Sequence, residues 1–147
     1  MDIISTEDLE LELRNQARYW QGVLSLSDWK IDFRLARSWE MVDADSVAQC
    51  QFFLERKDAI ISILHPMDLQ GVNERFVDEE ASDYDLSLVH ELLHLHLATI
   101  PMEDEWQEMM VEQAINAISR GLIQVFRAGL PNKVPVNQSS GVESGYI

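Results

Sequence analysis

The chain has 147 residues and a formal net charge of −15, with 46% hydrophobic and 25% charged residues. This composition is typical of a globular domain with a hydrophobic core, and a surface so acidic excludes nucleic acid and anionic membranes as expected partners. No apolar run approaches the roughly 18 residues that a membrane-spanning helix needs. The single cysteine, Cys50, excludes an internal disulfide and a four-cysteine zinc ribbon, and we interpret it as a small buried hydrophobic residue.

The N-terminal segment predicts a helix over residues 5–24. Its start is acidic and has no basic stretch followed by an apolar one, so it is not a signal peptide, and we expect a cytoplasmic protein. Ser5 is the expected N-cap, acidic residues fill the first turn, and Gly22 marks the expected end. The residues that share one apolar face are Leu9, Leu13, Ala17 and Trp20.

Three strands are predicted next. Residues 29–35 alternate apolar and polar side chains, as a half-buried strand does. Residues 46–54 and 59–64 predict two more strands, joined by a polar turn at 55–58. We expect a small sheet of three strands, with room for more, in mainly antiparallel pairing. Residues 66–82 form a polar connection.

Two helices complete the predicted order. The first covers residues 84–99 and ends before Pro101, because the residue preceding a proline is pushed out of helical geometry. The second covers residues 103–129. Helix, three strands and two helices make an α+β domain over residues 1–130, and the Pro, Gly and Ser content of 131–147 predicts a flexible tail.

The first of these two helices carries the motif HExxH, with His90, Glu91 and His94. Residues four apart lie about 40° apart around a helix, so both imidazoles face one side. Two such histidines bind a tetrahedral zinc ion, and the glutamate beside them can act as the general base toward a zinc-bound water. The motif therefore predicts a hydrolytic zinc site.

An alternative is that His90 and His94 are core or half-exposed histidines without a metal. A buried Glu91 between them would then be costly without a partner, which favours the metal. His96 lies about 200° around the helix from His94 and cannot bind the same ion. We interpret His96 and His65 as structural.

Zinc in a catalytic site needs a third protein ligand. Leu97 and Ile100 stand where the extended motif HExxHxxGxxH has glycine and histidine, so a metzincin pattern is excluded. Glu105, Glu108 and Glu112 follow on the last helix at spacings of three and four. The predicted apolar face of that helix comprises Val111, Ile115, Ile118 and Leu122. Glu108 and Glu112 border this face, whereas we interpret Glu105 as a solvated acid.

The chain resembles the small gluzincin peptidases, including the minimal forms in phage and prophage genomes. The resemblance is carried by "VHELLHLHL" (89–97), by "EQAINAIS" (112–119) and by "YWQGVLSLSDWKIDFRL" (19–35), and it spans roughly residues 9–128. It implies a zincin-like fold in which the HExxH helix packs beside a small sheet. The more distant SprT-like domains differ, because this chain has no zinc ribbon or basic region.

The resemblance also implies roles for individual residues. The zinc ligands would be His90, His94 and Glu112, and Glu91 would be the general base. By their spacing of one helical turn from Glu112, Glu108 and Asn116 are candidates for hydrogen bonds that orient the ligands. Tyr84 is a guess for the residue that stabilises the oxyanion.

Two functions remain open. The first is a zinc-dependent endopeptidase that acts on a protein or peptide, with a narrow substrate range. The second is a catalytically silent zincin-like protein that binds other proteins, and the presence of Glu91 favours the enzyme. Neither the substrate nor the oligomeric state follows from the sequence.

Overall fold

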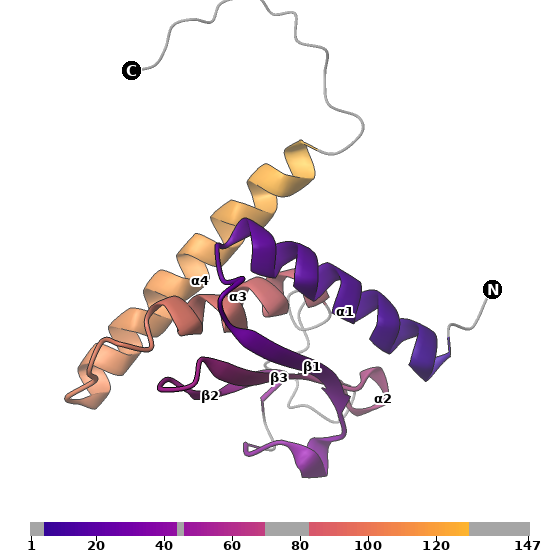
Figure 1. Cartoon of the computed structure of the whole chain (residues 1–147), viewed down its shortest axis with the longest axis horizontal. Helices are drawn as coiled ribbons and strands as arrows, with labels where there is room; N and C mark the ends of the chain where they lie inside the picture. Colours follow the sequence, from indigo (N-terminus) through magenta and orange to yellow (C-terminus); the bar gives the residue numbers. More distant parts are fainter. Residues whose placement is uncertain (1–4, 44–45, 70–82, 130–147) are drawn as a thin grey trace, which may run out of the picture.

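A computed structural model of the chain describes residues 5–43, 46–69 and 83–129. Its elements are α1 (Thr6–Val23), β1 (Lys30–Ala36), η1 (Ser38–Glu40), β2 (Ala48–Phe53), β3 (Asp58–Leu64), α2 (Pro66–Leu69), α3 (Tyr84–His96) and α4 (Glu105–Ala128). The long helices α1, α3 and α4 lie on one side of the three-stranded sheet (Figure 1). The predicted α+β class is confirmed, whereas the predicted tail over 131–147 lies outside the described residues.

The sheet is mixed, with strand order β1-β3-β2. β2 and β3 form the predicted antiparallel hairpin, in which Phe53 pairs with Asp58. β1 pairs with β3 in parallel, from Lys30 opposite Asp58 to Ala36 opposite Leu64. The prediction of a mainly antiparallel sheet was therefore wrong. Alternation of side chains identifies strands, but it does not give their order in the sheet, in which β3 lies between β1 and β2.

Helix α1 has the predicted cap and the predicted buried face. The Ser5 side chain accepts a hydrogen bond of 3.1 Å from the backbone N–H of Asp8. Leu13, Ala17 and Trp20 are buried. The indole N–H of Trp20 donates to Asp85 at 3.0 Å, which ties α1 to the start of α3.

Helix α3 is the centre of the core. It contacts α1, α4, β2 and β3, and its residues Leu88, Val89 and Leu92 are fully buried. The helix ends at His96, three residues before the predicted end. Leu97 N–H instead donates to the His94 carbonyl, and a turn follows before Pro101.

Helix α4 begins where Asp104 accepts a hydrogen bond of 2.8 Å from Gln107 N–H. Ile115 and Ile123 are buried, but Ile118 is 49% exposed, so its predicted place in the apolar face was wrong. Ser119 is buried instead, because its hydroxyl donates to the Ile115 carbonyl at 2.7 Å and a hydrophobic pattern does not count it. Within the described ranges, no helix combines the length and apolar character needed to cross a bilayer.

The central place of α3 leads to a stability prediction. Leu88→Ala should lower the free energy of unfolding by about 2–5 kcal/mol, because it leaves a cavity at a fully buried position. Urea denaturation followed by circular dichroism measures this loss. Leu11→Ala, at a position that is 58% exposed, is the matched control and should change stability far less. Equal losses in both variants would contradict the core described here.

Candidate metal centre

Helix α3 presents two imidazoles on one side. Its first turn is fixed by Asp83, whose carboxylate accepts a hydrogen bond of 3.1 Å from Leu86 N–H. His90 and His94 lie one turn apart, and the exposed fractions of their side chains are 20% and 28%. Their Nε2 atoms are 3.3 Å apart, so both rings point at the same place.

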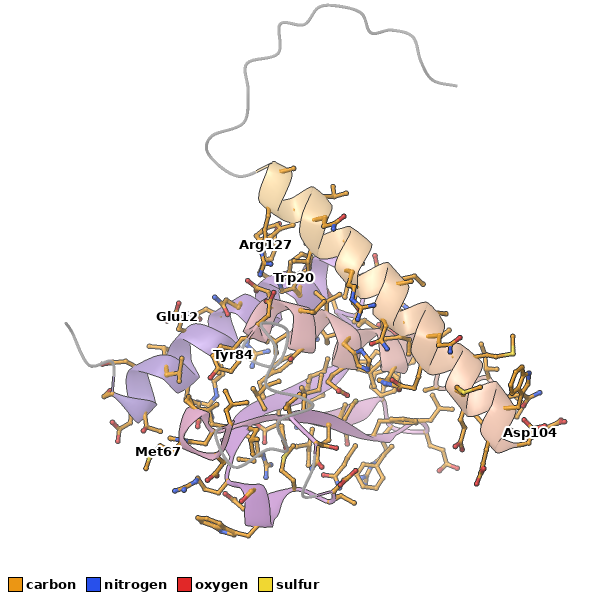
Figure 2. All side chains as sticks on the ribbon, turned by 180° about the vertical axis from the view of Figure 1, so that it is seen from behind. Glu12, Trp20, Met67, Tyr84, Asp104 and Arg127 are labelled. Carbon is orange, nitrogen blue, oxygen red and sulfur yellow. The ribbon has the colours of Figure 1, made fainter. Side chains whose placement is uncertain are left out.

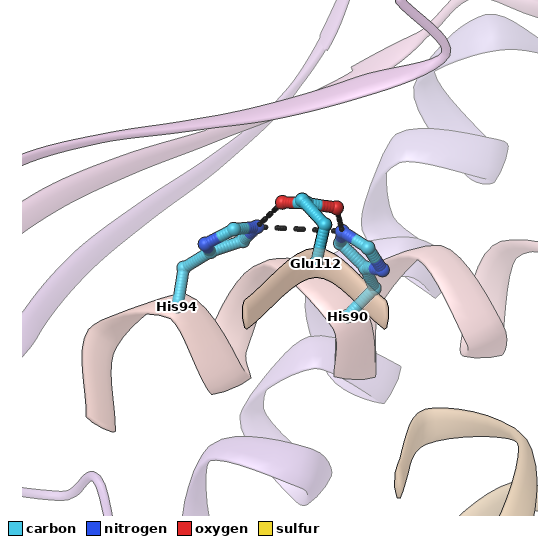
Figure 3. A group of neighbouring side chains, drawn as sticks. All are labelled: His90, His94 and Glu112. Carbon is cyan, nitrogen blue, oxygen red and sulfur yellow. Dashed lines mark hydrogen bonds and ion pairs between the residues drawn. The ribbon is translucent and has the colours of Figure 1, made fainter. Parts of the chain in front are cut away.

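Helix α4 supplies the third group, because Glu112 reaches across to both histidines (Figure 3). Its Oε1 lies 2.8 Å from Nε2 of His94, and its Oε2 lies 3.2 Å from Nε2 of His90. One ligand atom from each of the three residues falls within 4.8 Å of the other two. The structure thus brings together the three residues that the sequence and the resemblance name as ligands.

The spacing of the two histidine Nε2 atoms fits a tetrahedral metal ion. Two nitrogens bound to zinc at ~2.0–2.1 Å, in tetrahedral geometry, lie about 3.3–3.4 Å apart. The observed separation between the two Nε2 atoms is 3.3 Å. Two imidazoles and one carboxylate are also the ligand set of many catalytic zinc sites, which leave a further position open.

The charges around the three residues favour a cation. Hydrogen bonds with His90 and His94 hold the pKa of the Glu112 carboxyl well below its usual range. Burial lowers the pKa of His90, but its hydrogen bond to Glu112 and the charges of Glu91 and Glu112 outweigh burial, so the pKa of His90 is raised. The two shifts reflect one attraction, between the negative carboxylate of Glu112 and the positive charge of protonated imidazoles, and a metal ion bound between these groups would supply that positive charge instead.

Glu91 lies beside this cluster and is only 7% exposed. Burial raises the pKa of its carboxyl, and the charges of His90 and His94 oppose part of this rise. Among the residues that the structure describes, its carboxylate has no hydrogen-bond partner. A buried carboxylate without a partner lowers the stability of the fold. Groups that destabilise the fold in this way are typical of functional sites.

The sheet lies close to Glu91 through strand β2. Burial raises the pKa of Cys50 to about 12, and the charge of Glu91 adds to the rise. Cys50 packs against the core, as predicted for a small hydrophobic residue. It is only partly buried, whereas a buried residue was predicted. The charge of Glu91 therefore acts on Cys50 across the packing of α3 against β2.

The two residues predicted to orient the ligands differ in their positions. The side chain of Asn116 lies near His90 and contributes to the raised pKa of its imidazole, as expected for a residue beside a metal ligand. Glu108 is exposed and lines a groove next to His94 and Glu112. In the described part of the chain, the Glu108 carboxylate makes neither a hydrogen bond nor an ion pair.

Three further residues considered in the sequence lie apart from the cluster, namely Tyr84, His96 and His65. Tyr84 begins α3 and lines a separate cleft with α1 and Arg127 (Figure 2), so the structure does not bring it to the histidines. His96 Nε2 contacts the Leu24 carbonyl at 2.5 Å. His65 accepts a hydrogen bond from Met67 N–H at 3.2 Å and contacts Thr6 Oγ1 at 3.3 Å. Both histidines have structural contacts, as predicted.

The groove beside the cluster was not predicted. It has a volume of about 350 Å³, and His94 and Glu112 are among its lining residues. Its other lining residues are Phe52, Leu97, Ala98, Ile100, Met102, Glu108 and Val111. They come from β2, α4 and the connection between α3 and α4, and no pattern in the sequence links these segments.

Comparison with known proteins adds no family assignment. No family model matches the chain, and neither a curated protein nor a solved structure matches it.

Proposed function

We propose that the chain is a zinc-dependent endopeptidase with a zincin-like fold. The observation that carries this proposal is the cluster itself: His90, His94 and Glu112 converge, and beside them lies the buried carboxylate of Glu91, which has no hydrogen-bond partner within the described part of the chain. This combination is the one that metal-assisted hydrolysis requires, namely three ligands and a general base. A purely structural metal site would not need Glu91.

The roles of the residues follow from their positions. His90, His94 and Glu112 would hold the ion, and Asn116, which lies near His90, would help to keep its ring oriented. When bound, zinc supplies a Lewis acid that lowers the pKa of a coordinated water toward ~7 and polarises a carbonyl.

Glu91 would carry the proton during hydrolysis. Its carboxylate accepts a proton from the attacking water as the new C–O bond forms, and it returns a proton to the nitrogen as the peptide C–N bond breaks. The products are a carboxylic acid and an amine, and Glu91 ends in its starting state. Burial raises the pKa of its carboxyl and so makes Glu91 a stronger base than an exposed glutamate.

An extended peptide can be placed along strand β2. Within the described residues, β2 pairs with β3 alone, so its outer edge offers free backbone groups to an added strand. Cys50 of β2 lies close to Glu91, and Phe52 of β2 lines the groove beside His94. A peptide bound along this edge would therefore pass the general base.

Cleavage of a synthetic peptide library by the purified protein tests this proposal. We expect cleavage within the peptides, its loss when zinc is removed by a chelator, and its return when zinc is added. Products would be identified by mass spectrometry. Peptide binding without cleavage, in protein shown to hold zinc, would contradict the enzyme and favour the alternative of a protein-binding module.

A further inference from the structure

We propose that the groove beside the cluster binds a lysine or arginine side chain of the substrate, next to the peptide bond that is cleaved, and that Glu108 selects it. This inference rests on the proposed function, because it assigns a substrate class to the same site. Its basis is the position of the groove, its apolar walls and the carboxylate of Glu108, which is not one of the candidate metal ligands.

The groove is placed to receive a side chain of the reacting peptide. His94 and Glu112 line it, so an occupant lies beside two of the candidate metal ligands. Phe52, on the strand along which we place the peptide, forms one wall. A side chain that leaves a peptide on β2 near Glu91 would therefore enter this groove.

The walls of the groove fit the aliphatic part of a long side chain. Its apolar lining residues are Phe52, Leu97, Ala98, Ile100, Met102 and Val111. Lysine and arginine bury their methylene stems along such surfaces while the charged end stays in water or meets an acid. A short or strongly polar side chain would leave these walls exposed.

Glu108 supplies the charge that meets the end of the side chain. It is exposed on the groove wall, and in the described residues no cation pairs with it. Arg120 and Arg127, the basic residues of α4, lie three and more turns further along the helix. A cation at the end of an otherwise apolar side chain would therefore find a free carboxylate, and the net charge of −15 favours a basic substrate as well.

An apolar or an acidic side chain suits the groove less well. Methionine or leucine would contact the same walls but would leave Glu108 without a partner. A glutamate would place two carboxylates close together, which costs free energy. The expected order of preference is therefore lysine or arginine, then an uncharged side chain, then an acid.

The test compares peptides that differ at one residue beside the scissile bond. Lysine and its uncharged analogue norleucine have the same number of side-chain methylene and methyl carbons, so they separate charge from packing. With wild-type protein, we expect kcat/KM to be about two- to fivefold higher for lysine, the range that a partly exposed ion pair gives. The preference should shrink at high salt, since exposed charges are screened.

Glu108→Gln should remove the preference for lysine, so that the lysine and norleucine peptides are cleaved by this variant with similar kcat/KM. Glu105→Gln, an exposed acid on the same helix that does not line the groove, is the matched control and should keep the preference. A second readout measures equilibrium binding of the same peptides to Glu91→Gln protein, so that selection is seen without turnover.

The outcomes separate this inference from the proposed function. If both peptides are cleaved equally by wild type and by Glu108→Gln, the endopeptidase stands and the role of Glu108 is overturned. If nothing is cleaved but the lysine peptide binds more tightly and loses this advantage in Glu108→Gln, the groove inference stands in a protein that is not an enzyme. If Glu105→Gln and Glu108→Gln lose the preference equally, the general negative charge selects the substrate and the groove does not.

Discussion

Glu91→Gln is expected to lower kcat for peptide cleavage by at least about 10²–10⁴-fold, the usual contribution of general acid–base catalysis. Glutamine has nearly the same shape as glutamate but cannot take a proton from water at neutral pH. His90, His94 and Glu112 are unchanged by the substitution, so bound zinc should stay near the wild-type amount. The measurement is kcat on a cleaved library peptide, with metal content determined on the same sample.

The control for this variant is Glu105→Gln, an exposed acid outside the cluster. It should keep wild-type kcat and metal content. Thermal unfolding would show that Glu91→Gln is folded, since this buried position tolerates an uncharged amide better than a charged carboxylate. Cleavage at the wild-type rate by Glu91→Gln would overturn its assignment as general base.

Removing the metal should destabilise the fold strongly, because its ligands come from two different helices. Zinc bound by His90, His94 and Glu112 would link α3 to α4, and a ligand at 1,000 times its Kd stabilises the folded state by about 4 kcal/mol. For a domain of this size, we expect a chelator to lower Tm by roughly 10–20 °C. His90→Ala should have a Tm near that of the chelated wild type and should respond little to added zinc.

His96→Ala is the matched control for this experiment. It also removes an imidazole from α3, but His96 contacts the Leu24 carbonyl and lies outside the cluster. Its Tm should still fall on chelation and recover with zinc. A wild-type Tm that is the same with zinc and with chelator would contradict a metal that joins the two helices.

The residues of the site could be predicted from the sequence because helical geometry is regular. HExxH places two imidazoles on one side of a helix whatever surrounds it, and His96 is excluded by the same geometry. The spacing along α4 left Glu108 and Glu112 open, and the choice of Glu112 came from the resemblance. The structure brings Glu112 to both histidines, because α3 and α4 pack against each other.

Other features depend on long-range packing, which the sequence pattern does not encode. The parallel pairing of β1 with β3 requires that β2 form at the opposite edge, and a run of alternating residues looks the same in either order. The groove joins Phe52, Ile100 and Met102, which lie far apart in the sequence or in an irregular connection. The buried face of α4 differs from the predicted one. Ser119 takes the place of Ile118 in the core, because its hydroxyl donates a hydrogen bond to the Ile115 carbonyl.

The most direct test of the central claim is the metal content of purified protein. Wild type, Glu112→Ala and Glu108→Ala would be prepared without chelator or added metal and analysed by inductively coupled plasma mass spectrometry. We predict about one zinc per chain in wild type and in Glu108→Ala, as a single three-ligand site implies, and a large loss in Glu112→Ala. Wild-type protein that holds no metal even after zinc is supplied would contradict the site described here. Loss of the metal in Glu108→Ala but not in Glu112→Ala would contradict it as well.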